Sequence, residues 1–296
     1  MAIKSAYKGN YVTSILSKIS LLVLLVVLCA CSGAQSGASL RIMKLDEGSL
    51  LRPDQPFAKS VYDARSRSLY CLDRVQQQVN IYRNGALVNR LGSSDATRFL
   101  KLSDIALDPD GSVLCLDGLS KRITKFGPDG EKISSFDLTG MVQPELLCMS
   151  PDRTVFVYDA APMEIICLNS LSLEENYRFG RFQLPQPTSL LCSSNQVVVQ
   201  DQSAGSSYVF SILGELIGTY EDLRVYDDFN NAFVWNGMML SVSRSNSWEE
   251  ELSRIPSLEL LTGGRELRMS YSQGTLLLHN NVSALIYRVI YHNRYE

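Results

Sequence analysis

Residues 102–137 carry the clearest alternation of apolar and polar positions in the chain. Their sequence, LSDIALDPDGSVLCLDGLSKRITKFGPDGEKISSFD, contains four short runs of β-type pattern. These are Asp104–Leu107, Ser112–Leu116, Arg122–Phe126 and Lys132–Phe136, separated by Pro-Asp-Gly turns and by a polar segment that begins at Asp117. The second run alternates little, which is typical of a strand buried on both faces. Four antiparallel strands joined by tight turns predict one blade of a β-propeller.

The same unit recurs at a nearly constant spacing. Equivalent patterns cover Phe57–Leu91, Pro144–Phe179 and Pro187–Tyr220. An aspartate closes the second strand in all four units, and the steps between these aspartates are 44, 42 and 42 residues. The four are Asp73, Asp117, Asp159 and Asp201. A unit that repeats in register predicts stacked copies of one supersecondary structure.

Two weaker units complete the predicted ring. Ala232–Leu261 contains MMLSVS, with Ser243 at the place of the aspartate, and Glu266–His292 supplies about three strands. A further strand is expected from Leu40–Asp46, because pairing the first and last strands removes exposed sheet edges. Six units of about 42 residues fit residues 40–296. The predicted fold is all-β, a six-bladed β-propeller of four-stranded antiparallel blades closed by the N-terminal strand.

The repeated aspartates have a structural interpretation. At a strand end, a carboxylate accepts hydrogen bonds from the backbone N–H groups of the following turn. We therefore expect Asp73, Asp117, Asp159 and Asp201 to cap turns. A shared role in holding a ligand is the alternative.

One blade resembles the NHL repeat. The matching pieces are Asp108-Pro109-Asp110-Gly111, Val113–Asp117 and Ile123–Phe126. The resemblance extends partly over three other units, and the last two units depart from it. It implies a six-bladed propeller and no particular chemistry.

The N-terminus predicts export. Residues 1–18 hold three lysines and no acid, and they precede the apolar run Ile19–Ala30. Twelve residues span about 18 Å as a helix, short of a bilayer core of about 30 Å. A basic start, a short apolar run and a small residue before the cut predict a secretory signal peptide over residues 1–30. An uncleaved membrane anchor is the alternative.

The segment Leu28-Cys29-Ala30-Cys31 resembles a bacterial lipobox. The resemblance implies a diacylglycerol and an N-acyl chain on Cys31, and such multiple chains anchor a protein stably. Residues 31–39 are then the lipidated cysteine and a small, polar, flexible tether. The protein is expected in the cell envelope, bound to the membrane through this lipid. Ser32 after the cysteine implies the outer membrane if the host is diderm.

The net charge bears on the possible partners, and the spacing of the cysteines bears on possible disulfides. Removal of residues 1–30 leaves 25 basic and 31 acidic residues, a net charge of −6. Such a balance argues against nucleic acid as a partner. Five cysteines remain beyond Cys31, and their 44-residue spacings mark equivalent apolar positions of the repeat. Disulfides are the alternative in an exported chain.

Catalytic patterns are sparse. The two histidines, His279 and His292, both belong to the last unit, and the sequence contains no nucleophile elbow and no phosphate loop. Asp108-x-Asp110-Gly111 lacks the further ligands of a calcium loop, so a hairpin turn is expected there and no metal is predicted. The expected channel positions are Ser60, Asp104, Leu146 and Ser189, which include one acid. No cofactor is predicted, and whether the protein is an enzyme stays open, with the balance against it.

Binding is the remaining prediction. Loops after the second strands hold Arg74, the Lys121-Arg122 pair and the segment 246–251, in which Trp248 resembles an interface hot spot. A Trp packed over a blade edge is the alternative for Trp248. The leading hypothesis is a non-catalytic binding or scaffolding lipoprotein with envelope protein partners. A metal-dependent lactonase-like hydrolase and a carbohydrate or small-ligand sensor are the alternatives.

Overall fold

The computed structural model describes residues 41–45, 49–94, 97–169, 171–184, 186–201, 203–244, 247–251 and 267–292. The predicted signal peptide, Cys31 and the tether lie outside these residues. No helix of the described chain is long and apolar enough to cross a membrane. The chain divides into two compact units, residues 1–43 with 291–296 and residues 44–290, and the propeller belongs to the second.

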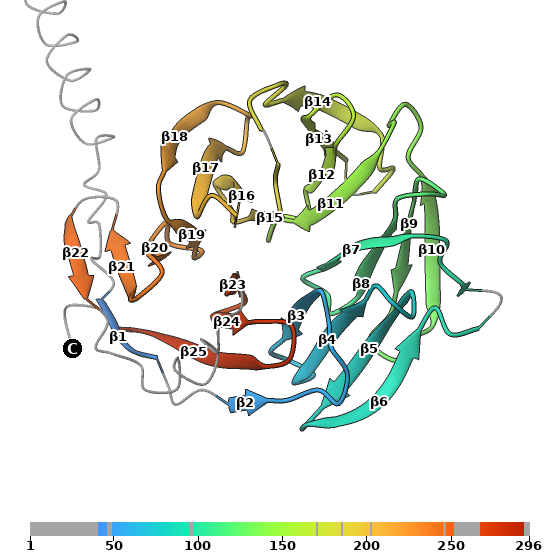
Figure 1. The fold of residues 1–296 in the computed structure, drawn as a ribbon, viewed down its shortest axis with the longest axis horizontal. Coiled ribbons are helices and arrows are strands. Elements are labelled where there is room, and N and C mark those ends of the chain that lie inside the picture. The colour runs from blue at the N-terminus through green and yellow to red at the C-terminus, as the bar shows by residue number, and fades with distance from the viewer. Residues whose placement is uncertain are drawn as a thin grey trace, which may run out of the picture. The chain divides into compact units, whose positions relative to one another are not determined.

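The structure confirms the six-bladed β-propeller (Figure 1). Each of the first five blades is a four-stranded antiparallel sheet whose strands follow one another in chain order. Blade 1 comprises β3 (Lys59–Asp63), β4 (Ser68–Asp73), β5 (Gln78–Arg83) and β6 (Ala86–Leu91). Blade 2 comprises β7 (Leu102–Leu107), β8 (Val113–Asp117), β9 (Arg122–Phe126) and β10 (Lys132–Asp137). Blade 3 comprises β11 (Pro144–Met149), β12 (Val155–Asp159), β13 (Glu164–Leu168) and β14 (Glu175–Phe179).

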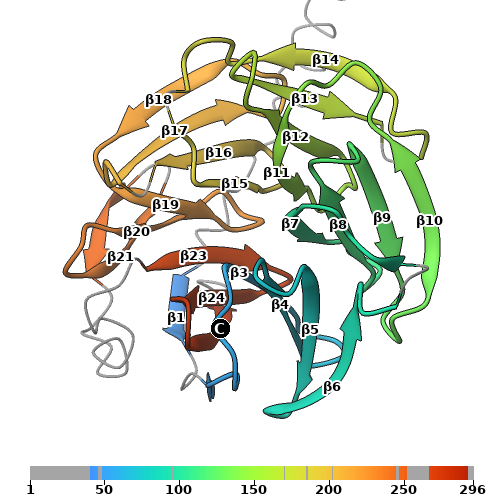
Figure 2. The ribbon, with the colours of Figure 1, turned by 45° about the vertical axis from the view of Figure 1, so that its right-hand side comes forward.

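Blades 4 to 6 continue the ring (Figure 2). Blades 4 and 5 comprise β15 (Ser189–Cys192), β16 (Gln196–Asp201), β17 (Ser206–Ser211), β18 (Leu216–Tyr220); and β19 (Leu223–Tyr226), β20 (Ala232–Trp235), β21 (Leu240–Arg244), β22 (Ser247–Glu251). Blade 6 comprises β23 (Arg268–Ser272), β24 (Thr275–His279) and β25 (Ala284–His292), joined by β1 (Arg41–Leu45) and β2 (Ser49–Leu51) from the start of the chain.

The strand predicted over Leu40–Asp46 is observed as β1, which lies beside β25 in the sheet of blade 6. A second N-terminal strand, β2, was not predicted and also pairs antiparallel with β25, so that Leu51 lies opposite Ala284. The last blade thus takes strands from both ends of the propeller, which covers an edge that would otherwise stay open to other chains.

Neighbouring blades are held together by apolar side chains between their sheets. The second strand of each repeat lies in the middle of this packing, and all five residues of β8 are buried. Ile105 and Cys115 of blade 2 pack against Tyr70 and Ile81 of blade 1, for example. Burial on both faces explains why the second strands do not alternate in sequence.

The strand order gives the propeller two distinct faces. Antiparallel strands place the loops between strands two and three at the same end as the linkers that join strand four to the next blade. We call this end the linker face. The opposite end, which carries the turns between strands one and two and between strands three and four, is called the hairpin face.

Candidate functional site

A ring of side-chain caps shapes the loops of the linker face. Asp73 Oδ1 accepts hydrogen bonds from the N–H groups of Val75 and Gln76, both at 2.9 Å. The same two-and-three-residue pattern recurs at Asp117, Asp201, Asn236 and Asn280. Asparagine therefore takes the place of aspartate in blades 5 and 6. Asn236 and Asn280 were not predicted from the sequence, although the Asn-Gly and Asn-Asn pairs that follow the strands are turn signals.

Asp117 also holds the linker that enters its own blade. Its carboxylate accepts N–H bonds from Leu100 and Lys101 at 2.7 and 3.1 Å, besides those from Leu119 and Ser120. Burial alone would raise the pKa of Asp117, but the backbone hydrogen bonds outweigh it and lower the pKa below 3.8. The carboxylate thus stays ionised and fixes the loop and the linker side by side.

Asp159 makes the corresponding linker contacts in blade 3. Its two carboxylate oxygens accept N–H bonds from Val142 and Gln143, at 2.8 and 2.6 Å. The side chains that follow these caps are consequently held at fixed positions on the linker face.

Several of those side chains are large, apolar and exposed. Val75 and Leu119 occupy the loops after strand two, and Leu100, Val142 and Phe182 occupy the linkers before strand one of blades 2, 3 and 4. Their exposed fractions run from 60% for Val142 to 88% for Val75. We call these five residues the apolar set. Large apolar side chains gathered on one face of a soluble domain are typical of an interaction surface.

Basic side chains accompany the apolar set. Arg74, Arg98, Lys101, Lys121 and Arg181 are exposed on the same loops and linkers. Lys101 lies 3.6 Å from Glu145, and the guanidinium of Arg181 lies 5.0 Å from the ring centre of Phe182. Arg181 Nε also lies 3.9 Å from Glu164 Oε2. Arg74, Arg98 and Lys121 have no carboxylate partner among the described residues, so they are the uncompensated positive charges on these loops and linkers.

The other residues that the sequence singled out for binding lie in different places. Arg74 is on the linker face and its Nη2 donates to Ser103 O at 2.8 Å. Arg122 begins β9 rather than lying in a loop, and its Nε donates to Asp137 Oδ1 at 2.7 Å.

The prediction that Trp248 lies in a loop after strand two is wrong. Trp248 belongs to β22, the fourth strand of blade 5. Ser243 lies in the third strand, β21, and Trp235 ends the second. The linker between β18 and β19 has only two residues, so strand two of blade 5 begins earlier in the sequence than a constant repeat length predicts. The constant repeat length therefore places strand two where strand three is observed.

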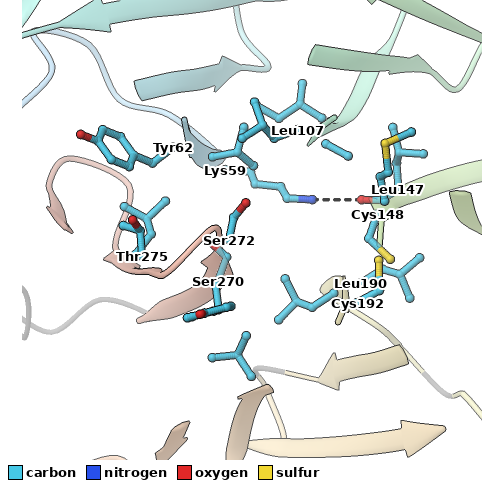
Figure 3. A pocket seen from close by; sticks show the side chains of 18 residues that line it. Lys59, Tyr62, Leu107, Leu147, Cys148, Leu190, Cys192, Ser270, Ser272 and Thr275 are labelled. Carbon is cyan, nitrogen blue, oxygen red and sulfur yellow. Dashed lines mark hydrogen bonds between the residues drawn. The ribbon is translucent and has the colours of Figure 1, made fainter. Parts of the chain in front are cut away.

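The central channel is a small cavity bordered by the first strands of all six blades (Figure 3). The volume open to water there is about 80 Å³. Most of the lining is apolar, from residues such as Leu147 and Leu190. Lys59 reaches across the cavity, where its Nζ lies 2.8 Å from Asp104 Oδ1 and 3.3 Å from the carbonyl oxygen of Leu147. A second, more polar cavity of about 260 Å³ lies at the hairpin-face mouth of the channel.

The predicted channel positions do not converge on a reactive group. Asp104 is 1% exposed and accepts N–H bonds from Ile105 and Leu147 in addition to its ion pair with Lys59. Ser60 and Ser189 are buried, and Leu146 packs into the core between blades 3 and 4. The described residues contain no group of three or more His, Cys, Asp or Glu side chains able to hold a metal. Asp104 would have to lose its lysine before it could serve as a ligand or base.

The described histidine side chain is also structural. His279 is 2% exposed, and its ring packs 5.7 Å from that of Phe57. Burial, followed by the charge of Arg268, lowers the pKa of His279 to about 3. The imidazole is thus neutral at physiological pH and closed to solvent. The side chain of His292 lies outside the described residues.

The Asp108-x-Asp110 turn is neutralised by cations of the chain itself. Lys125 Nζ lies 2.7 Å from Asp108 and 2.8 Å from Asp110. Burial would raise the pKa of Asp110, but hydrogen bonds from Lys125 and Ser112 hold it at about 2. The two carboxylates act together as a structural ion pair with Lys125.

Comparison with known proteins places the fold and goes no further. No protein-family model matches the chain, and neither does any curated protein sequence. Among solved structures, a gluconolactonase from Xanthomonas campestris is similar with a TM-score of 0.57 at 15% identity, over 87% of this chain and 94% of that one.

Two further propellers are similar at about the same level. Virginiamycin B lyase from Staphylococcus aureus, solved as a catalytically inactive histidine-to-alanine variant with quinupristin, has a TM-score of 0.51 at 11% identity, over 78% of this chain and 80% of that one. The β-propeller domain of Cps50 (Swd1) from Myceliophteria thermophila has a TM-score of 0.52 at 11% identity, over 83% of this chain and all of that one. At these identities the likeness shows a shared propeller fold.

Proposed function

We propose that this protein is a lipid-anchored, exported binding module that holds a protein partner on the linker face of blades 1 to 3. The observation that carries the proposal is the apolar set, five large apolar side chains exposed on adjoining loops and linkers. Burying one such side chain in an interface is worth about 1.5–3 kcal/mol. Five such side chains are held in contact with water on these loops and linkers, so the free energy falls when a partner covers them.

The surrounding charges specify the chemistry of the partner. Arg74, Arg98 and Lys121 add positive charge to the loops and linkers that carry the apolar set, and none of the three has a carboxylate partner among the described residues. The complementary surface is acidic, with apolar or aromatic side chains at its centre. Phe182, backed by the Arg181 guanidinium, is the side chain best suited to act as an anchor. Because the charges are exposed, rising salt should slow association.

The channel supports binding over catalysis. Among the described residues, Asp104 is the carboxylate next to Lys59 in the channel, and it is already bound by Lys59 and by two backbone N–H groups. A lactonase-like hydrolase would need converging carboxylates and amides in the channel, and this donor set does not fit that requirement.

Anchoring at the membrane rests on residues 1–31. The signal-peptide pattern and the resemblance of Leu28–Cys31 to a lipobox support an acylated Cys31 in the cell envelope. Replacing Cys31 by alanine should release the protein from membranes into the soluble fraction, as followed by fractionation and immunoblotting. Continued membrane association of the variant would refute the lipid anchor.

Crosslinking in intact envelopes tests the partner. A C-terminally tagged chain is crosslinked, purified and examined by mass spectrometry, and one near-stoichiometric protein is expected. The variants Leu100→Ser and Phe182→Ser should each lose most of that protein. The matched controls Leu171→Ser and Leu213→Ser remove equally exposed side chains, 84% and 75%, from the hairpin face and should retain it. Equal loss in all four variants, or no partner in repeated trials, would refute the proposal.

A further inference from the structure

Two thiols meet in the central channel. Cys148 is in β11 of blade 3 and Cys192 ends β15 of blade 4, and both border the channel cavity. Figure 3 shows the sulfur atoms of Cys192 and Cys148 close together at the edge of the cavity, and the two residues come from the first strands of neighbouring blades. Both thiols are free. The other three described cysteines do not border this cavity.

The surroundings of this pair differ from those of an ordinary buried thiol. Cys192 also borders the polar mouth cavity on the hairpin face, beside Ser193. A small ion can therefore approach the pair from solvent through the mouth. On the channel side, burial raises the pKa of Cys192, and the nearby charge of Lys59, which is also paired with Asp104, offsets only part of that rise. The pair thus has an entry path and a cation close by.

We propose that Cys148 and Cys192 form a two-thiolate site for a soft monovalent cation, with Cu(I) as the metal. Soft thiolate ligands select Cu(I). Structural zinc requires four ligands, and the described residues offer no third His, Cys, Asp or Glu beside the pair. A two-coordinate soft ion is the class that two facing thiols satisfy.

The charge balance of binding is simple. Two S–H bonds break, two metal–sulfur bonds form, and two protons leave to solvent. The metal enters and stays as Cu(I), so no electron is transferred. The product carries one net negative charge beside the ammonium of Lys59, which borders the same cavity and is already paired with Asp104. Burial raises the pKa of Cys192 well above its usual value, so that thiol is protonated before the metal arrives.

Anaerobic competition titration tests the site. The reduced mature chain is titrated with Cu(I) held by bicinchoninate, and one Cu(I) per chain is expected. Cys148→Ala and Cys192→Ala should each weaken binding by more than about 100-fold, beyond what loss of an outer-shell partner causes. Cys71→Ala, a matched change at a thiol that is 1% exposed and borders neither cavity, should leave binding unchanged. Binding that survives both channel variants, or falls equally in the control, would overturn the proposal.

Two measurements on the protein without substitutions test the site even if the cysteine variants do not fold. X-ray absorption at the copper edge should show two sulfur neighbours and no nitrogen neighbour. Three or more sulfur neighbours, or any nitrogen, would place the metal elsewhere. Peptide mapping of the unreduced chain should find Cys148 and Cys192 as free thiols, since a disulfide between them would abolish the site.

Discussion

Replacing Asp117 by alanine removes an acceptor on which two separate segments converge. Its carboxylate binds the N–H groups of Leu119 and Ser120 in the loop after strand two, and those of Leu100 and Lys101 in the preceding linker. Asp73 offers an internal standard, because its carboxylate accepts hydrogen bonds from the loop after its own strand, from the N–H groups of Val75 and Gln76. The two substitutions are otherwise alike, since both carboxylates end a second strand and are 5% exposed.

The expected magnitudes follow from these contacts. Loss of a side-chain cap costs about 0.5–2 kcal/mol when one or two N–H groups lose their acceptor. Asp73→Ala is therefore expected to lower the free energy of unfolding by about 1 kcal/mol. Asp117→Ala leaves twice as many N–H groups without an acceptor and should cost about 2–3 kcal/mol. Asp117→Asn keeps one carbonyl oxygen for three of the four N–H groups and should fall between them.

Urea unfolding of the mature domain measures these differences. Fluorescence and far-ultraviolet circular dichroism should give coincident transitions, and midpoints are then compared at constant slope. In a domain of this size, a loss of 2–3 kcal/mol lowers Tm by roughly 4–12 °C. If Asp117→Ala costs no more than Asp73→Ala, the linker contacts contribute nothing and the reasoning fails.

Three further predictions address the channel, the effect of pH and the cysteines. Lys59→Met leaves the Asp104 carboxylate buried without its cation and should cost about 3 kcal/mol in the same urea assay; a loss below about 1 kcal/mol would show that the pair is unimportant. Because the folded-state pKa of Asp117 lies below 3.8, its contribution to stability is present above that pH and is lost as pH falls further. Asp117→Asn should therefore flatten the decline of unfolding free energy in acid, and an unchanged decline would contradict the assigned pKa. Thiol titration of the denatured, unreduced mature domain should find five free thiols, and a lower count would reveal a disulfide.

The sequence was sufficient to predict the blades because each carries its own local signals. Pro-Asp-Gly turns, unbroken apolar second strands and a closing aspartate all depend on residues close in the chain. In blade 5 these local signals do not predict the strands correctly. Its short linker and its Asn236 cap break the period, and the strand around Trp248 was consequently taken for a loop.

The candidate site was less visible in the sequence. Leu119 and Leu138 are both leucines beside polar residues, yet one is 64% exposed and the other 4%. Exposure depends on which segment packs above a side chain, and that is set by contacts between blades. The pairing of Lys59 with Asp104 joins different blades for the same reason. The spacing of Cys148 and Cys192 predicts equivalent repeat positions, but their proximity depends on how blades 3 and 4 pack against each other around the channel.

The pairing of β2 with β25 limits how early the propeller can close while the chain is being synthesised. Leu51 leaves the ribosome roughly 230 residues before its partner Ala284. At about 5–20 residues per second, the first strand waits about 10–50 s before the strand that completes its sheet exists. During that interval no closed ring can form, so the blades made first remain open to outside partners. The native topology therefore cannot be completed until synthesis is almost finished.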